Sequence, residues 1–263
     1  MPRPAGRGAA NPRVGVVLAA HGSGDPRAAA ATQALARAVA RVRPDWEVRA
    51  AYLDHSLPRP AAALGALEAA GHGRAVLVPL LLTAAYHGRV DVPAELTAAR
   101  ADGLSLEVAV ADVLGPVAGK IPPLLLDGLV RRLPMAGGRA AGLDAVVLAA
   151  AGTRDAAARG TVEHVAAALG ERLGLPCGVA YASAAPPTAA EAVARLRAAG
   201  ARRVGVASYF LAPGRLYDAA MRSARSAGAV AVAEPLSDAS ELAELVVGRV
   251  VQAGAGLAVA DAA

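Results

Sequence analysis

The stretch VGVVLAAHGSGDPRA, residues 14–28, runs apolar for seven residues and then reaches a histidine followed by Gly-Ser-Gly-Asp-Pro. An apolar run of this length that ends at small polar residues is typical of a buried strand, and Asp-Pro is typical of a helix start. Residues 144–158, DAVVLAAAGTRDAAA, repeat this order, but Ala151 stands where the first copy has His21. The sequence therefore predicts two copies of a strand–turn–helix unit, of which one carries the histidine.

The composition indicates a soluble protein that is not disulfide-bonded. Of the 263 residues, 55% are hydrophobic, but no apolar run approaches the roughly 20 residues that a bilayer span needs. The single cysteine, Cys177, excludes an internal disulfide and a multi-cysteine metal site. Residues 1–13 lack the apolar segment of a signal peptide and are predicted to be a disordered leader. We expect a cytoplasmic protein with no membrane partner.

The net charge of +5 does not predict a nucleic-acid partner. The basic residues are scattered along the chain, and aromatic residues, at 3%, offer no platform on which bases could stack. A basic cleft would instead suit a polyanionic small molecule.

Apolar, strand-like runs alternate with alanine-rich helical stretches along the chain, which is typical of βαβ units with a parallel sheet. In the first half the pattern predicts strands at residues 14–20, 47–53, 75–82 and 106–111 and helices at 25–42, 58–70, 93–101 and 117–133. In the second half it predicts strands at residues 145–150, 178–182, 203–211 and 229–233 and helices at 156–173, 187–199, 214–227 and 239–252.

These elements predict an α/β fold of two tandem, similar Rossmann-like domains, each a small, mostly parallel sheet flanked by helices. The first domain is predicted to cover residues 14–133 and the second residues 144–252. Residues 134–143 are glycine-rich and aperiodic, so they are predicted to be a linker, and residues 253–263 a flexible tail. In such sheets, ligands bind outside the carboxyl ends of the strands.

His21 directly follows the first predicted strand, which places its imidazole at this ligand-binding edge. Gly22 and Gly24 would let the backbone approach a ligand closely, and Ser23 could donate a hydrogen bond. A small polar turn that only connects strand to helix would explain the same residues.

Two further strands end in residues that can bind a metal. His87 lies in LLLTAAYHGRVDVPAEL, in a predicted loop of about ten residues before a helix that opens at Pro93, and such loops are more often functional than connecting. Asp54 ends the second strand beside His55, and successive strand residues point to opposite faces, so one of the pair is expected to face the site. We favour Asp54 and keep His55 as an alternate ligand. An exposed loop histidine and a turn-capping aspartate are the alternatives.

Two imidazoles and a carboxylate at one edge would suit Fe²⁺, Co²⁺, Ni²⁺ or Zn²⁺. Three protein ligands would leave coordination positions open for exchange or catalysis, and neutral imidazole accepts protons near physiological pH. His72 and His164 are expected to be solvated, in a loop and on a helix surface respectively.

Three segments in this order and spacing resemble the class II chelatases that insert metal into sirohydrochlorin: AAHGSGDPRA after the first strand, AYLD closing the second and VPLLLTAAYHGRVDVPAEL after the third. The resemblance covers nearly the whole chain, since longer members contain two similar α/β domains. It implies a chelatase-like fold and a lyase that inserts Fe²⁺ or Co²⁺ into sirohydrochlorin, a tetrapyrrole polycarboxylate, for siroheme or cobalamin biosynthesis. It implies no cofactor beyond this substrate metal.

The resemblance also implies roles for particular residues. His21 and His87 become the metal-binding and catalytic positions, in a cleft between the domains. Asp54 stands where the family often has glutamate, which keeps the charge but shortens the reach. The glycine pair common before the second histidine is Ala85-Tyr86 here.

The family's substrate carries eight carboxylates, and arginine binds carboxylates through paired hydrogen bonds. The expected substrate-binding residues near the strand ends are Ser23, Arg27, Arg89, Arg154 and Arg215. A long loop in YFLAPGRLYD, residues 209–218, is a further expected contact. The second half lacks both histidines, so one active site per chain is expected.

Two other functions fit part of the pattern. A non-catalytic metal or tetrapyrrole carrier would use the same residues. A histidine-dependent phosphohydrolase fits less well, because Ala20 stands where histidine phosphatases have arginine, and no Gly-x-Ser-x-Gly elbow is present.

Overall fold

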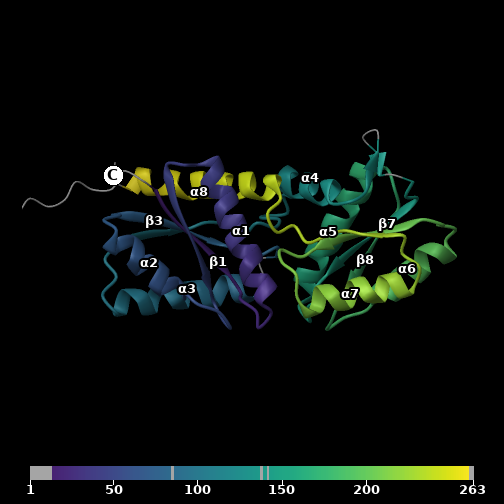
Figure 1. Ribbon diagram of the computed structural model, residues 1–263, viewed down its shortest axis with the longest axis horizontal. Coiled ribbons are helices and arrows are strands. Elements are labelled where there is room, and N and C mark those ends of the chain that lie inside the picture. The colour runs from purple at the N-terminus through teal and green to yellow at the C-terminus, as the bar shows by residue number, and fades with distance from the viewer. Residues whose placement is uncertain (1–13, 84–85, 137–138, 141, 261–263) are drawn as a thin grey trace, which may run out of the picture.

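The fold consists of two parallel sheets with helices on both faces of each (Figure 1). A computed structural model describes residues 14–83, 86–136, 139–140 and 142–260, and of residues 86–91, 135–136, 139–140 and 255–260 it describes the backbone alone. The predicted leader lies outside the described residues.

The first sheet has four parallel strands in the order β2-β1-β3-β4. Its strands are β1 (Val14–Ala20), β2 (Trp46–Tyr52), β3 (Arg74–Pro79) and β4 (Glu107–Val110), and the helices that follow them are α1 (Pro26–Val42), α2 (Pro60–Ala69), α3 (Tyr86–Ala101) and α4 (Pro123–Arg131). Because β1 and β3 are paired neighbours, the segments that follow them leave the same edge of the sheet.

The second sheet repeats this arrangement in the order β8-β7-β9-β10. Its strands are β7 (Ala145–Ala150), β8 (Cys177–Tyr181), β9 (Val204–Tyr209) and β10 (Ala231–Val232), and its helices are α5 (Ala156–Leu173), α6 (Ala189–Ala198), α7 (Arg215–Ser226) and α8 (Ser240–Ala260). A short hairpin of β5 (Met135–Ala136) and β6 (Arg139–Ala140) joins the halves within the predicted linker. The equal strand order and direction confirm the predicted tandem α/β fold.

Both halves start their first helix in the same way. The Asp25 carboxylate accepts a hydrogen bond from the backbone N–H of Arg27 at 3.0 Å, and Asp155 accepts one from Ala157 at 2.8 Å. Each aspartate satisfies a backbone donor that the helix leaves unpaired. The helix starts predicted at these two aspartates are therefore confirmed.

One face of each sheet contributes to a core that the two halves share. Val16 and Leu18 of β1 and Val146 and Leu148 of β7 belong to the same buried cluster. The residues that alternate with them face outward, where α2 and α3 cover the first sheet and α6 and α7 the second. The two halves thus pack as one continuous body.

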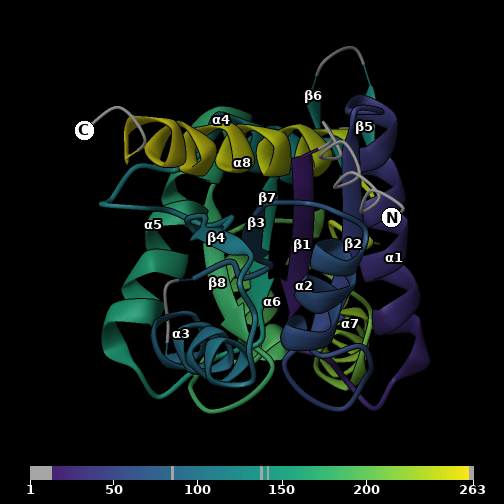
Figure 2. The same ribbon diagram turned by 90° about the vertical axis from the view of Figure 1, so that its left-hand side faces the viewer.

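The last helix of each half packs on the other half. α8 lies over the first sheet and contacts β3, β4 and α1, whereas α4 contacts α5 and β9 (Figures 1 and 2). An ion pair of 2.8 Å between Arg131 and Glu241 joins the two exchanged helices. We therefore propose that residues 14–133 and 144–252 are the units of the sequence repeat. In the folded chain, α4 of the first unit packs on the second half and α8 of the second unit packs on the first half.

The structure corrects the predicted start of α4 and the predicted end of α8. The helix predicted at 117–133 begins only at Pro123. Val117 and Lys120 exchange backbone hydrogen bonds in a tight turn, and a proline disfavours the helical conformation of the residue before it. α8 runs to Ala260 and covers most of the predicted flexible tail, as its alanine content favours helix. Although α8 has 21 residues, neither it nor another helix of the described chain is long and apolar enough to cross a membrane.

His72 is buried, so its prediction as a solvated loop residue was wrong. Its side chain has 0% exposure, and Nε2 lies 2.9 Å from Oε2 of Glu47 on β2. The loop sequence could not reveal this partner, which lies on another strand. His72 precedes β3, at the sheet edge opposite His21, and is a structural residue.

His72→Ala is expected to lower the free energy of unfolding by about 2 kcal/mol, because it removes a buried hydrogen-bond partner and leaves a gap. His72 also holds the pKa of Glu47 below its ordinary value, with help from Arg49. That contribution to stability is present above the unfolded pKa and is lost as the pH falls through the folded one. Urea denaturation at pH 7 and pH 4 measures both effects. Equal stability of the variant and the wild type at pH 7 would contradict this role.

Candidate functional site

His21 is the residue at which three cavities meet. It is exposed at the end of β1 and lines cavities of about 270, 460 and 540 Å³. The first two lie between the halves, and the third extends toward α3. We call them the apolar recess, the inter-half cavity and the α3-side cavity.

The inter-half cavity has one wall from each half of the chain. Residues 21–24 and His55 line it from the first half, and Ala151 and part of 210–217 line it from the second. The carboxyl ends of β1 and β7 therefore open into the same cavity. His21 and its counterpart Ala151 both line it. Of these two equivalent positions in the shared cavity, only the one in the first half carries a histidine.

The apolar recess supplies a hydrophobic wall beside His21. It is lined by Leu35 of α1, by Leu80 after β3 and by Phe210 and Pro213 of the second half. The Phe210 ring packs edge-on against Tyr217, with ring centroids 5.7 Å apart. Such walls suit a flat apolar body whose orientation is fixed by a few polar groups. The loop in YFLAPGRLYD was an expected substrate contact, but its aromatic residues were not predicted as part of it.

The α3-side cavity brings two carboxylates near His21. Asp54 and Glu95 line it together with Arg59. The backbone N–H of His55 donates to Oδ1 of Asp54 at 2.8 Å and lowers the pKa of that carboxyl, so Asp54 is ionised at neutral pH. Glu95 was not predicted, since no sequence signal separates it from other polar residues on a helix.

Asp54 and His55 line different cavities. Asp54 lines the α3-side cavity, whereas His55 lines the inter-half cavity, and His21 lines both. The backbone of His55 has a φ of 59°, and its Nε2 lies 3.5 Å from Oδ2 of Asp54. Asp54 therefore stays a candidate ligand in the α3-side cavity, and His55 stays a candidate ligand in the inter-half cavity.

His87 and Arg89 lie in the first turns of α3 and not in a loop. α3 starts at Tyr86 and contains Pro93, so the predicted start at Pro93 was wrong. A proline inside a helix removes one backbone hydrogen bond, which this helix accommodates. The side chains of His87 and Arg89 are outside the described residues, and their roles stay predictions. Among the side chains that are described, no group of three or more His, Cys, Asp or Glu could hold a metal ion.

The other predicted substrate-binding residues have different surroundings. Ser23 and Arg215, the first residue of α7, line the inter-half cavity. Arg154 is exposed and is not among the described residues that line the three cavities. Arg27 forms ion pairs with two aspartates, one from each half.

Comparison with known proteins gives matches in both halves. The CbiX family model matches residues 15–130 and 145–253. A curated sirohydrochlorin cobaltochelatase of Methanococcoides burtonii is 26% identical over 81 residues, which is 31% of this chain and 62% of that relative, less than two thirds of its length.

Two solved structures share the fold over most of the chain. SirB from Bacillus subtilis with Fe³⁺ has a TM-score of 0.74 at 19% identity, covering 92% of this chain and 95% of that one. The sirohydrochlorin chelatase SirB from Bacillus subtilis subspecies spizizenii, in complex with cobalt, has a TM-score of 0.73 at 17% identity and the same coverage, 92% and 95%. The family match in both halves supports the resemblance seen in the sequence, and the chain belongs to the CbiX family.

Proposed function

We propose that this protein inserts Fe²⁺ or Co²⁺ into sirohydrochlorin, an activity that serves siroheme or cobalamin biosynthesis. The observation that carries the proposal is the position of His21, between a cleft with one wall from each half and a cavity lined by carboxylates. Family membership supports the proposal, as does the name of the Methanococcoides relative, a sirohydrochlorin cobaltochelatase.

The two substrates fit different cavities. The apolar recess and the inter-half cavity, with Phe210 in both and Arg215 in the latter, suit a flat macrocycle that carries carboxylates. The α3-side cavity, with Asp54 and Glu95, suits a divalent cation that still carries water. In this scheme the macrocycle and the metal ion reach His21 from different cavities.

Insertion exchanges two pyrrole N–H protons for one divalent ion. The imidazole of His21, when neutral, accepts the two ring protons one after the other and passes each to solvent, while the ionised Asp54 binds the incoming ion as it sheds water. His87 serves as the second imidazole for proton or metal transfer. Weak, incomplete ligation favours the reaction, because a closed cage of protein ligands would retain the ion.

The test uses metal-free sirohydrochlorin, Co²⁺ or anaerobic Fe²⁺, and protein at a small fraction of the substrate concentration. We expect the absorbance change of metal insertion to run faster than the uncatalysed reaction and to continue through many equivalents per protein. A rate equal to the uncatalysed one would contradict the proposal. Binding without acceleration would indicate a carrier, and hydrolysis of phosphomonoesters without insertion would indicate the phosphohydrolase.

A further inference from the structure

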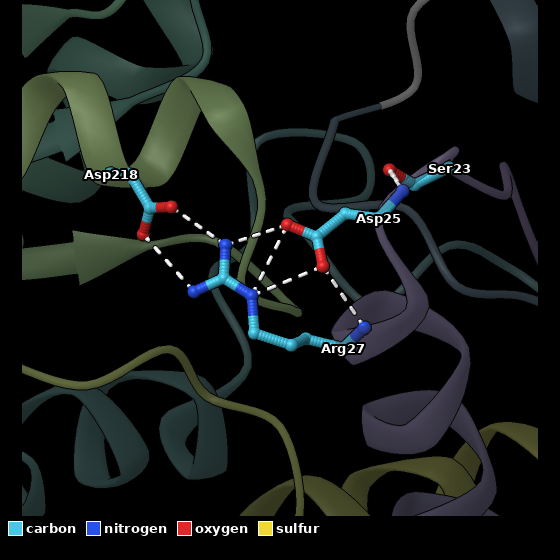
Figure 3. A network of polar contacts seen from close by, with 4 residues as sticks. All are labelled: Ser23, Asp25, Arg27 and Asp218. Carbon is cyan, nitrogen blue, oxygen red and sulfur yellow. Dashed lines mark hydrogen bonds and ion pairs between the residues drawn. The ribbon is translucent and has the colours of Figure 1, made fainter.

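Arg27 joins two carboxylates that come from different halves of the chain (Figure 3). Its Nη2 lies 2.6 Å from Oδ2 of Asp218 and 2.6 Å from Oδ2 of Asp25. Its Nε lies 3.0 Å from Oδ1 of Asp25. The guanidinium fork thus already holds a carboxylate from across the cleft.

The ion pair between Arg27 and Asp218 lies next to residues that line the inter-half cavity, although neither side chain is itself a lining residue. Arg27 lies in the first turn of α1 and Asp218 in the first turn of α7. Gly24, just before α1, and residues 214–217, at the start of α7, line that cavity. The two side chains are 51% and 27% exposed, so water and a ligand can reach them. Arg215, in the same turn of α7 as Asp218, does line the cavity.

The two aspartates have different roles. Asp25 is fixed as the N-cap of α1, where it accepts the backbone N–H of Arg27 at 3.0 Å. Asp218 is not a cap, because the N-cap of α7 is Gly214, which has no side chain to cap the helix, and the carboxylate of Asp218 accepts hydrogen bonds from Arg27. Asp25 therefore serves the helix start and also binds the Nε side of the guanidinium, whereas Asp218 binds only the Nη1 and Nη2 side, from across the cleft.

Stability does not explain the pair between the halves. The halves share a buried core and exchange α4 and α8. The buried Tyr209 also donates to the carbonyl oxygen of Leu82, across the halves, at 2.7 Å. An exposed ion pair adds little to contacts of this kind. A carboxylate on an arginine fork at a cleft is, however, the arrangement that a carboxylate ligand would form.

We propose that Asp218 is an internal competitor: it occupies the carboxylate position of Arg27 in the empty cleft, and a carboxylate of the bound ligand replaces it. This inference rests on the proposed function, and the ligand class is a flat polycarboxylate. Ligand binding replaces the ion pair of Arg27 with Asp218 by an ion pair of Arg27 with the ligand. Arg27 therefore contributes to the free energy of binding only the difference between the free energies of these two ion pairs. Asp218 thereby weakens the binding of the ligand and favours its release.

The test measures the Kd of metal-free sirohydrochlorin by absorbance or fluorescence titration for four proteins: the wild type, Asp218→Asn, Arg27→Gln and the double variant. Asp218→Asn is expected to tighten binding by about twofold to fivefold, the range for exposed ion pairs. Arg27→Gln is expected to weaken binding, and adding Asp218→Asn to it is expected to change nothing further. Melting temperatures are expected to stay near the wild-type value, so the change in Kd is the readout that a purely structural pair would not produce.

Asp45→Asn is the matched control. It breaks the ion pair between Arg43 and Asp45, which has the same length of 2.6 Å and lies at the other end of α1. Its Kd is expected to equal that of the wild type. An unchanged Kd for Asp218→Asn would overturn the inference, as would equal tightening in the Arg27→Gln background, while the proposed function would stand. A wild type that neither binds nor metallates sirohydrochlorin would overturn both.

Discussion

His21→Ala is expected to lower the rate of metal insertion at least about 100-fold, the lower range for loss of a positioned acid or base. The substitution removes the imidazole that lines both the inter-half cavity and the α3-side cavity, so the ring protons lose their proposed acceptor at the point where macrocycle and metal ion meet. The measurement is the initial rate of the absorbance change with sirohydrochlorin and Co²⁺. His87→Ala is expected to act similarly, because His87 is proposed to be the second imidazole for proton or metal transfer.

The fold is expected to survive His21→Ala. The second half builds the same turn with Ala151, and Gly152 there has a φ of 91° where Gly22 has 93°. His164, exposed on α5, provides the control substitution to alanine, for which rate and melting temperature are expected to stay at wild-type values. An undiminished rate in His21→Ala would remove it from the mechanism, and an equal loss in His164→Ala would make the effect nonspecific.

The sequence predicts elements whose formation depends on near neighbours along the chain. The apolar run of β1, the N-cap at Asp25 and their copies in the second half are of this kind. The exchange of α4 and α8 could not be predicted in this way, because an apolar helix face fits either sheet. Contacts between residues distant in sequence select the sheet on which each helix packs. The burial of His72 against Glu47 escaped prediction for the same reason.

Some residues of the candidate site can likewise be predicted from local sequence features, whereas others come together only through the fold. His21 could be identified because a strand end and a glycine-rich turn are local features, and the sheet order then places the segment after β3 beside it. Phe210 and Glu95 come near His21 only through the packing of the second half and of α3. Arg27 was predicted as a carboxylate-binding residue, but its occupation by Asp218, 191 residues away, follows from the fold alone.

Gly22→Ala is expected to lower both stability and activity. Gly22 has a φ of +93°, and a Cβ there would lie 1.7 Å from the carbonyl oxygen of Asp54, so the backbone must move. Strained backbone conformations cost about 1–3 kcal/mol, and we expect a loss of at least about 2 kcal/mol in the free energy of unfolding. The shift displaces His21 and Asp54, so the insertion rate per folded molecule falls as well. Urea denaturation and the insertion assay measure the two effects.

Gly152→Ala separates these two effects, because the second half repeats the geometry without the histidine. Gly152 has a φ of +91°, and its Cβ would lie 2.0 Å from the carbonyl oxygen of Ser183. A comparable loss of stability is expected, but the rate per folded molecule is expected to stay near that of the wild type. If Gly22→Ala also kept its rate per folded molecule, the turn would serve folding alone. If instead Gly22→Ala loses activity and Gly152→Ala, at equal stability, keeps it, the close approach of Gly22 to Asp54 positions the imidazole and the carboxylate for the reaction.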